Sequence, residues 1–196
     1  MAKERLQDFE IVNAHQPSNR TATPTVQKWK PPEHGLVKVN CDGARFAEEN
    51  RAGIGVVIRN SKGLVLGSLS KLVPQAYGPL EIEVMAVATA LVFASNLGFQ
   101  RAIFETDLLV LVKALREGME FHSAVGLVLD EIRHTVNFFN DLHYSHVKRE
   151  GNIVAHKLAR HAICVLDVVV WMEDVPPLLF PLAVDPRDAW EYINIL

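Results

Sequence analysis

Hydrophobic and polar positions first predict three short strands. Residues 36–41 partly alternate between apolar and polar side chains and end at Asp42-Gly43, which predicts a strand followed by a turn. The ranges 52–59 and 64–69 are rich in branched apolar residues and flank the turn residues 60–63, so they predict two more strands. Because the connections are short, we expect the three strands to form an antiparallel meander.

After the meander, helical patterns alternate with strands. Residues 80–97 are rich in Ala, Leu, Val and Glu, and they follow Gly78-Pro79 and stop before Gly98, which is typical of a helix. The pattern then predicts a strand over 101–105, helices over 107–117 and 122–138, a strand over 142–146 and a helix over 152–165. This order indicates an α/β fold with a five-stranded mixed sheet, in which three antiparallel strands precede two parallel ones and helices cover both faces.

The pattern also divides the chain into a domain and two flanking segments. We predict a folded domain over residues 33–165. Residues 1–32 are polar and aperiodic, and their small apolar surface predicts a flexible leader. Residues 166–196 form an apolar tail broken by prolines, which we expect to pack on the domain or on a partner. The most apolar stretch, 163–184, is interrupted by acidic residues and prolines, so no membrane span is predicted there.

Composition and charge narrow the function classes. The chain has 196 residues, of which 49% are hydrophobic and 22% charged, the balance of an ordinary soluble globular protein. A formal net charge of −3 argues against binding nucleic acid by bulk positive charge, so any such contact would be local or bridged by cations. Two distant cysteines do not form a disulfide framework, so we expect an intracellular protein, cytoplasmic or nuclear. We expect a monomer.

Three carboxylates stand out by their position in this pattern. Asp42 ends the first predicted strand, Asp107 follows the fourth, and Glu83 lies one turn inside the long helix. If the first and fourth strands are parallel neighbours, both aspartates emerge at the same carboxyl edge of the sheet. Converging carboxylates repel each other, and Mg²⁺ or Mn²⁺ would neutralise them. Two such ions could hold an attacking water and a departing oxygen on either side of a phosphate.

Four segments then carry a family resemblance. They are Val37–Ala44, Glu83–Leu91, Glu105–Asp107 and His146–Ala159, in this order along the chain. Together they resemble type 1 ribonuclease H, and most closely the plant-type, retroelement-related branch of that superfamily. The resemblance covers about two thirds of the chain and implies the same order of strands and helices. It also implies hydrolysis of the RNA strand of RNA–DNA hybrids, which leaves 5′-phosphate and 3′-hydroxyl ends.

The resemblance also implies roles for particular residues. Asp42, Glu83 and Asp107 match the metal-binding carboxylates of the family. His146 matches the histidine that helps proton transfer and product release, although alone it would be read as a surface residue after a strand. Asn152 matches the asparagine near the substrate backbone, although alone it would be read as a helix N-cap. Both interpretations of Asn152 can hold together.

One position departs from the family pattern. His156 stands where nuclease members carry a fourth aspartate, and we include it among the candidate catalytic residues. An imidazole can ligate Mn²⁺ but suits Mg²⁺ poorly, so we expect weakened activity or a shift toward Mn²⁺. A modest basic patch lies nearby, at Lys148, Arg149, Lys157 and Arg160. We take Lys148 and Arg149 as candidate substrate-binding residues and expect weak, salt-sensitive binding.

Three hypotheses follow from the sequence. The first is a metal-dependent endoribonuclease that cleaves RNA–DNA hybrids. The second is a non-catalytic nucleic-acid-binding module derived from a retroelement, which His156 favours. The third is a protein-interaction domain that uses the apolar residues of the tail, namely Trp171, Leu178, Leu179 and Phe180. Metal binding at the carboxylates would separate the first hypothesis from the other two.

Overall fold

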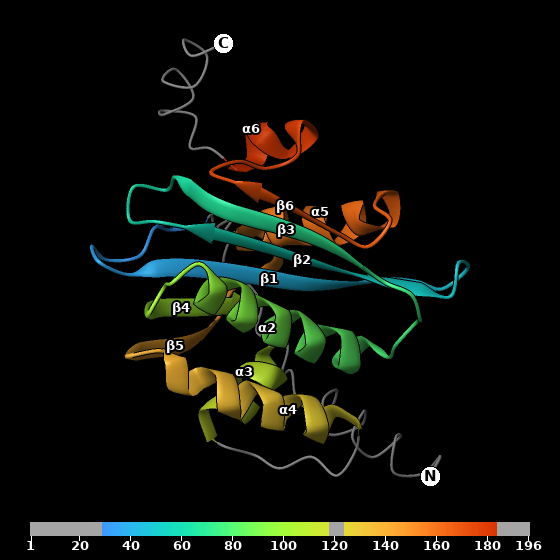
Figure 1. Ribbon diagram of the computed structural model, residues 1–196, viewed down its shortest axis with the longest axis horizontal. Helices are drawn as coiled ribbons and strands as arrows, with labels where there is room; N and C mark the ends of the chain where they lie inside the picture. The colour runs from blue at the N-terminus through green and yellow to red at the C-terminus, as the bar shows by residue number, and fades with distance from the viewer. Residues whose placement is uncertain (1–28, 118–123, 184–196) are drawn as a thin grey trace, which may run out of the picture.

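A six-stranded mixed sheet forms the centre of the protein (Figure 1). The computed structural model describes residues 29–117 and 124–183. In chain order, the strands are β1 (Val37–Phe46), β2 (Arg51–Arg59), β3 (Val65–Val73), β4 (Arg101–Thr106), β5 (Asp141–His146) and β6 (Val168–Met172). Their order across the sheet is β5-β4-β1-β2-β3-β6. The helices are α2 (Pro79–Asn96), α3 (Leu109–Glu117), α4 (Ala124–Thr135), α5 (Ile153–His161) and α6 (Phe180–Ala183).

The predicted meander is confirmed. β1 pairs with β2 and β2 with β3, both antiparallel. The turn between β2 and β3 is built by Asn60, whose side-chain oxygen accepts hydrogen bonds from the backbone N–H groups of Lys62 and Leu64. Gly63 in the same turn has a φ of +83°, a conformation that glycine adopts without steric strain. Local turn chemistry therefore sets the register of this hairpin.

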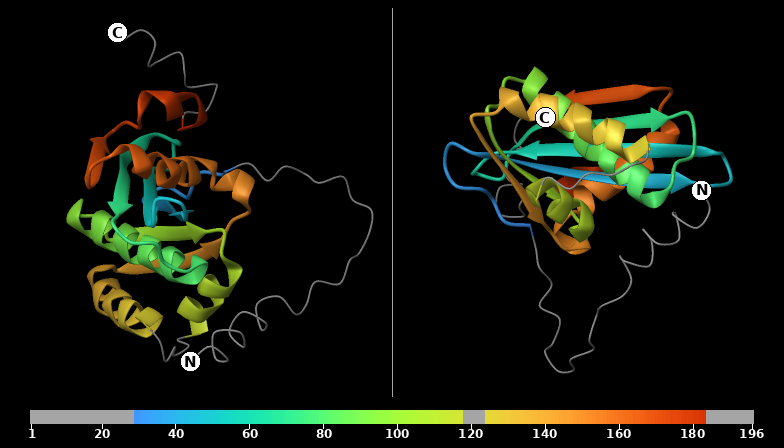
Figure 2. Two further views of the ribbon diagram at one scale, coloured as in Figure 1. Left: turned by 90° about the vertical axis from the view of Figure 1, so that its right-hand side faces the viewer. Right: turned by 90° about the horizontal axis from the view of Figure 1, so that it is seen from below.

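The second half of the fold adds parallel strands. β4 pairs parallel with β1, and β5 pairs parallel with β4. Parallel neighbours need crossover connections, which α2 provides before β4 and which α3 and α4 provide before β5. α2 packs against β1 and β2 with α4 beside it, while α5 packs against the opposite face of the same strands (Figure 2). The predicted arrangement, with helices on both faces, is confirmed.

Apolar residues fill both sides of the sheet. The larger core lies between the sheet and α2 and includes the fully buried Ile54, Leu91 and Phe104. A second cluster joins Val57 of β2 to Leu158 of α5. α2 is long and apolar enough to cross a membrane by length and composition, but half of that span is buried inside the protein. Its apolar character is therefore that of a core helix covered by the sheet and α4.

The expectation of five strands is wrong, because the tail contributes a sixth. β6 pairs antiparallel with β3 at the edge of the sheet. Its residues are all apolar in sequence, and most of their side chains are exposed in the structure. The segment therefore lacks the alternation of apolar and polar residues that marks a half-buried strand. The chain after β6 then packs on the α5 face, where Val175, Leu179 and Ala183 are buried. Up to Ala183, the apolar tail packs on the domain itself.

The N-terminal flank also contacts the domain. Residues 1–28 of the predicted leader lie outside the described residues, as do residues 184–196 of the predicted tail. The backbone oxygen of Lys30 accepts a hydrogen bond from the Lys38 ammonium at 2.7 Å. The Trp29 ring stacks on the Arg59 guanidinium, whose carbon lies 3.7 Å from the ring centroid. The end of the leader is thus anchored on the first two strands.

Candidate metal centre

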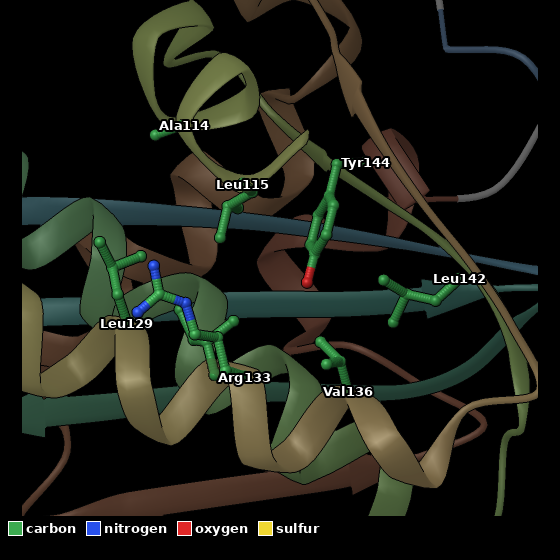
Figure 3. A pocket seen from close by; sticks show the side chains of 8 residues that line it. Ala114, Leu115, Leu129, Arg133, Val136, Leu142 and Tyr144 are labelled. Atoms are coloured by element: carbon green, nitrogen blue, oxygen red, sulfur yellow. The ribbon is translucent and has the colours of Figure 1, made fainter. Parts of the chain in front are cut away.

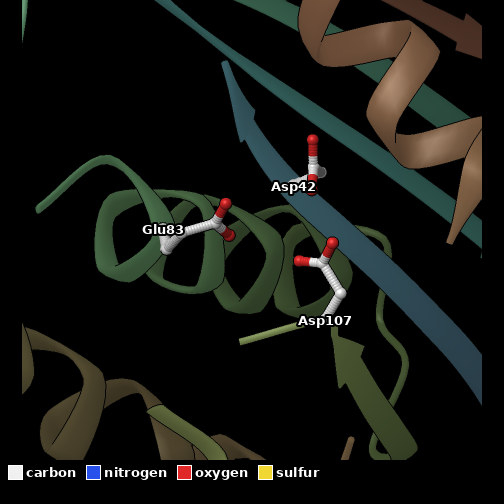
Figure 4. A group of neighbouring side chains, drawn as sticks. All are labelled: Asp42, Glu83 and Asp107. Atoms are coloured by element: carbon white, nitrogen blue, oxygen red, sulfur yellow. The ribbon is translucent and has the colours of Figure 1, made fainter. Parts of the chain in front are cut away.

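The structure brings the three predicted carboxylates together. Asp42 lies in β1, Glu83 in α2, and Asp107 directly after β4. One ligand oxygen from each lies within 4.8 Å of the others. Figure 4 shows the three carboxyl groups pointing toward one another from these elements. The expectation that the first and fourth strands are parallel neighbours is confirmed, because their ladder pairs Asn40 with Glu105, two residues before each aspartate.

Asp42 nevertheless does not end its strand. β1 continues to Phe46, and Asp42 pairs with Gly55 of β2. The turn predicted at Asp42-Gly43 is therefore wrong. Only the parallel ladder with β4 stops, at Asn40, whereas the antiparallel ladder with β2 continues beyond it. At Asp42, β1 is still paired with β2 but no longer with β4. The side of Asp42 that faced β4 is therefore free to face Asp107 and Glu83.

Glu83 is held by a helix with a well-defined start. The Glu81 carboxylate accepts a hydrogen bond from the Gly78 backbone N–H at 2.7 Å, which caps the first turn of α2. Burial raises the pKa of the Glu83 carboxyl, and the charges of Asp42 and Asp107 raise it further. Hydrogen bonds from the Gly43 backbone and the Thr106 hydroxyl oppose this rise. Thr106, which supports Glu83 from the end of β4, was not among the residues predicted from the sequence.

Asp42 is subject to opposing influences. Its side chain is buried, and this burial raises the pKa of its carboxyl from 3.8 to about 6. The hydrogen bond from His156 lowers this pKa, the charge of Asp107 raises it, and the charge of Arg149 lowers it. Burial is the largest of these effects. At neutral pH the ionised Asp42 carboxyl therefore destabilises the metal-free protein.

The residues present fit a divalent cation. Glu83 Oε2 is buried and has no hydrogen-bond partner among the described residues. An unpaired buried carboxylate oxygen is costly unless something supplies positive charge or a proton. Three carboxylates offer the hard oxygen ligands that Mg²⁺ and Mn²⁺ prefer. The orphaned oxygen within the carboxylate cluster indicates a cation as the missing partner.

Neutralising Asp42 is therefore expected to stabilise the metal-free protein. The pKa of the Asp42 carboxyl is higher in the folded protein than in the unfolded chain, so ionisation of this carboxyl lowers the free energy of unfolding. This loss is absent below the unfolded pKa of 3.8, grows as the pH rises toward about 6, and is complete at neutral pH. At about 1.4 kcal/mol per pKa unit, Asp42→Asn should raise the free energy of unfolding in EDTA by on the order of 1–3 kcal/mol near neutral pH. Urea unfolding of both proteins measures this difference.

The same variant should respond differently to metal. Millimolar Mg²⁺ should raise the melting temperature of the native protein, because an ion that binds only the folded state stabilises it. It should have little effect on Asp42→Asn, because that variant has lost a ligand and a charge. Equal responses of the two proteins to Mg²⁺ would contradict the assignment of Asp42 as a metal ligand.

His146 lies beside the carboxylates. It is the exposed last residue of β5 and pairs with Thr106 in the parallel ladder. Its Nε2 lies 3.1 Å from the backbone oxygen of Asp107 and donates a hydrogen bond to that carbonyl. The structure thus places His146 at the solvent-facing rim of the centre. Its role in proton transfer stays a prediction.

His156 contacts the centre through Asp42. Its Nδ1 lies 2.9 Å from Asp42 Oδ2, and its Nε2 lies 3.1 Å from Arg149 Nη2. Arg149 precedes α5 and His156 lies in its first turn, so the last helix carries both groups to the first strand. Arg149 and His156 were each predicted as site residues, but the hydrogen bonds that link Arg149 through His156 to Asp42 were not predicted. The spacing of seven residues across an irregular turn contained no signal for this contact.

Asn152 anchors α5 to β1. Its side-chain amide donates to the Cys41 carbonyl at 2.9 Å, and the residue is only 1% exposed. It occupies the N-cap position of α5, but its side chain makes no capping hydrogen bond. Its backbone oxygen instead accepts the N–H of His156. Asn152 therefore helps to position His156 next to Asp42. The contact of Asn152 with substrate stays a prediction.

A buried polar network supports the strands that carry the aspartates. The Glu105 carboxylate pairs with the Lys38 ammonium at 2.9 Å and accepts a hydrogen bond from the Asn40 amide at 2.9 Å. Arg59 donates to Asn40 at 2.9 Å and stacks on Trp29. Such paired buried groups tolerate little displacement. This network, which the sequence analysis missed, fixes the register of β4 against β1 next to the centre.

A separate small pocket lies between α3, α4 and β5. Its volume is about 160 Å³, and its lining is apolar apart from Arg133 and Tyr144, as Figure 3 shows. The Tyr144 hydroxyl is buried, and this burial raises its pKa. The carboxylate centre is not part of this pocket, whose lining offers no hard anionic ligand for a cation.

Known proteins share the architecture of this chain. The family model described as reverse transcriptase-like matches residues 40–162. RNase H1 from the halophilic archaeon Halobacterium salinarum is similar, with a TM-score of 0.61 and 22% identity over 66% of this chain and 98% of that chain. The N-terminal RNase H domain of a Mycobacterium tuberculosis protein has a TM-score of 0.60 and 21% identity over 66% of this chain and 94% of that chain.

A third structure contains a nucleic acid. It is an RNase H1 isolated from compost, in complex with an RNA/DNA hybrid, with a TM-score of 0.58 and 23% identity over 65% of this chain and 96% of that chain. At these identities the likeness establishes the fold. The search of curated proteins found no match.

Proposed function

The chain belongs to the reverse transcriptase-like family, which has the ribonuclease H fold, and we propose that it hydrolyses the RNA strand of RNA–DNA hybrids with divalent cations. The observation that carries this proposal is the convergence of Asp42, Glu83 and Asp107 within 4.8 Å, with a buried Glu83 oxygen left without a partner. The hybrid bound to the similar compost enzyme supports the substrate class.

The chain's own residues have distinct proposed roles. Asp42, Glu83 and Asp107 hold the cation, for which Mg²⁺ is proposed and Mn²⁺ is a substitute. The bound cation would supply a Lewis acid for the phosphate and lower the pKa of a water molecule. His146, exposed beside Asp107, would pass a proton between the centre and solvent.

Substrate would approach from the side where basic residues are exposed. Lys148, Arg149 and Lys157 are exposed at the start of α5, and Arg149 also contacts His156. We propose that they bind phosphates of the hybrid. A few such contacts give affinity that falls as salt rises, with a slope set by the number of phosphates neutralised. Because both cysteines are free, we propose that the protein works in a reducing intracellular compartment.

A cleavage assay tests the proposal. The purified protein is incubated with a hybrid labelled on its RNA strand, in Mg²⁺, in Mn²⁺ and in EDTA, beside RNA–RNA and DNA–DNA duplexes of the same sequence. We expect cleavage of the RNA strand of the hybrid only, with 5′-phosphate products, and none in EDTA, because the carboxylates alone supply no positive charge to the phosphate. Cleavage that survives EDTA would contradict the proposal.

A second candidate function is hybrid binding without catalysis. The observation that favours it is His156, which stands at the fourth acidic position of the family and forms hydrogen bonds through both ring nitrogens. A histidine engaged in this way adds no ligand for a cation. Salt-dependent hybrid binding with no cleavage in either metal, by a folded protein, would select this function over the nuclease.

A further inference from the structure

The hydrogen bonds of His156 determine which of its nitrogens carries the proton. Its Nε2 faces the Arg149 guanidinium at 3.1 Å, and a guanidinium can only donate hydrogen bonds. Nε2 must therefore accept, so the proton of the neutral ring is on Nδ1. Nδ1 donates this proton to Asp42 Oδ2 at 2.9 Å. Both nitrogens are committed, and His156 has no lone pair left for a metal ion.

We propose that this centre holds one divalent cation, between Asp42, Glu83 and Asp107, and that the Arg149–His156 pair takes the place of a second cation beside Asp42. The inference rests on the proposed metal-dependent function and differs from the two ions predicted from the sequence. It assigns Arg149 and His156 as positioning residues. They act on Asp42 through hydrogen bonds and charge.

The two oxygens of Asp42 have different surroundings. The side chain is only 4% exposed, and its Oδ2 accepts the proton of His156. A cation bound to Oδ2 would have to displace this N–H donor and approach the Arg149 guanidinium behind it. The Asp42 carboxyl also offers an oxygen within 4.8 Å of ligand oxygens of Glu83 and Asp107, and ionised carboxylates can only accept hydrogen bonds. One side of Asp42 is thus suited to a cation and the other to a hydrogen-bond donor.

Charge balance leads to the same conclusion. Three ionised carboxylates carry three negative charges, which one divalent cation and the Arg149 guanidinium together would match. A second divalent ion would leave the cluster with excess positive charge unless the substrate phosphate compensated for it. An aspartate at position 156 would favour a second cation, because it would add one negative charge to the cluster and remove the N–H donor from Oδ2.

The test counts bound ions in the full chain. Free Mn²⁺ is measured by electron paramagnetic resonance during a titration, in the presence of a DNA strand paired with a 2′-O-methyl RNA strand that resists cleavage. We expect one Mn²⁺ per native chain and two per His156→Asp chain. His156→Asn is the matched control, because asparagine has the size of aspartate without its charge, and it should bind one ion.

The outcomes separate this inference from the proposed function. Two Mn²⁺ ions in the native chain, or one ion in His156→Asp, would overturn the single-cation inference and leave metal-dependent hydrolysis standing. Binding no greater than that of Asp42→Asn would overturn both. Circular dichroism confirms that each variant is folded, so that a lost ion is not mistaken for a lost structure.

A second readout tests the hydrogen bonds without metal or substrate. In a protein labelled with ¹⁵N-histidine, the neutral His156 ring should show its proton on Nδ1, and Arg149→Gln should change the Nε2 shift of that ring. Assignment of the resonance comes from its loss in His156→Asn. A proton on Nε2 in the native protein would contradict the arrangement, because that nitrogen could no longer accept from Arg149.

Discussion

Replacing Asp107 with asparagine is expected to lower the rate of hybrid cleavage by at least about 1000-fold. Asp107 follows β4 and supplies one of the three converging ligand oxygens. Asparagine keeps the size and one oxygen but removes the negative charge that is proposed to bind the cation. A bound cation contributes several kcal/mol to transition-state stabilisation, and about 1.4 kcal/mol corresponds to each tenfold change in rate. Single-turnover cleavage of a labelled hybrid measures this loss.

A matched change elsewhere in the domain controls for the substitution itself. Asp141 begins β5 and forms an exposed pair with Arg101 at the start of β4, at the opposite end of that strand from Asp107. Asp141→Asn should leave the cleavage rate within a factor of about two, because exposed ion pairs contribute only about 0–1 kcal/mol to stability. An Asp107→Asn protein that keeps more than about a tenth of the native rate would contradict the proposed role of Asp107.

Gly55→Ala is expected to destabilise the fold severely. A β-carbon at Gly55 would lie 2.2 Å from the backbone oxygen of Ala155 and 2.2 Å from the backbone nitrogen of Ala159. Backbone atoms of a helix cannot move aside as a flexible side chain can, so α5 would have to leave β2. We expect a loss of about 3–5 kcal/mol in the free energy of unfolding, at the upper end for overpacking. Urea denaturation monitored by tryptophan fluorescence measures it.

Gly78→Ala provides the comparison for this substitution. A β-carbon at Gly78 would meet the Glu81 side-chain oxygen at 3.1 Å, the far end of a flexible side chain. Its φ of −64° suits any residue, so the change should remove less than about 1 kcal/mol of stability. If both alanine variants lost similar stability, the close approach of α5 to Gly55 would not be the cause.

The missing side chain of Gly55 also affects the geometry of the candidate metal centre. Gly55 pairs with Asp42 across the β1–β2 ladder, and the helix that it admits carries His156 onto Asp42. The same close packing also lets Asn152 reach the Cys41 carbonyl. A glycine in the meander thus determines how near the last helix comes to the first carboxylate.

Local sequence patterns were sufficient to predict most strands and helices of the fold. The predicted meander, the long helix after Gly78-Pro79 and the two later strands all appear in the structure near their expected positions. These elements depend on side-chain periodicity and turn residues, which act over a few neighbouring positions. The convergence of Asp42 and Asp107 also followed, because parallel neighbours must bring their carboxyl ends to one edge.

Two local interpretations failed for the same reason. Asp42-Gly43 has the residues of a turn, but pairing with β2 carries β1 on to Phe46. Val168–Met172 lacks the alternation of a strand, but the free edge of β3 pairs with it. In both cases hydrogen bonds to a distant segment outweighed the local preference, and no short window of sequence contains that partner.

The sequence by itself determined the order of elements up to α5 and pointed to the three carboxylates that converge. Only the tertiary structure decided what surrounds them: the hydrogen bond between His156 and Asp42, the Arg149 guanidinium at the other nitrogen of that imidazole, and the hydrogen bond from Asn152 to β1. The physical reason is separation along the chain. His156 lies 114 residues from Asp42, and their hydrogen bond exists because α5 packs closely against Gly53 and Gly55 of β2. Residue types can indicate a centre, but packing determines how its charges are partnered.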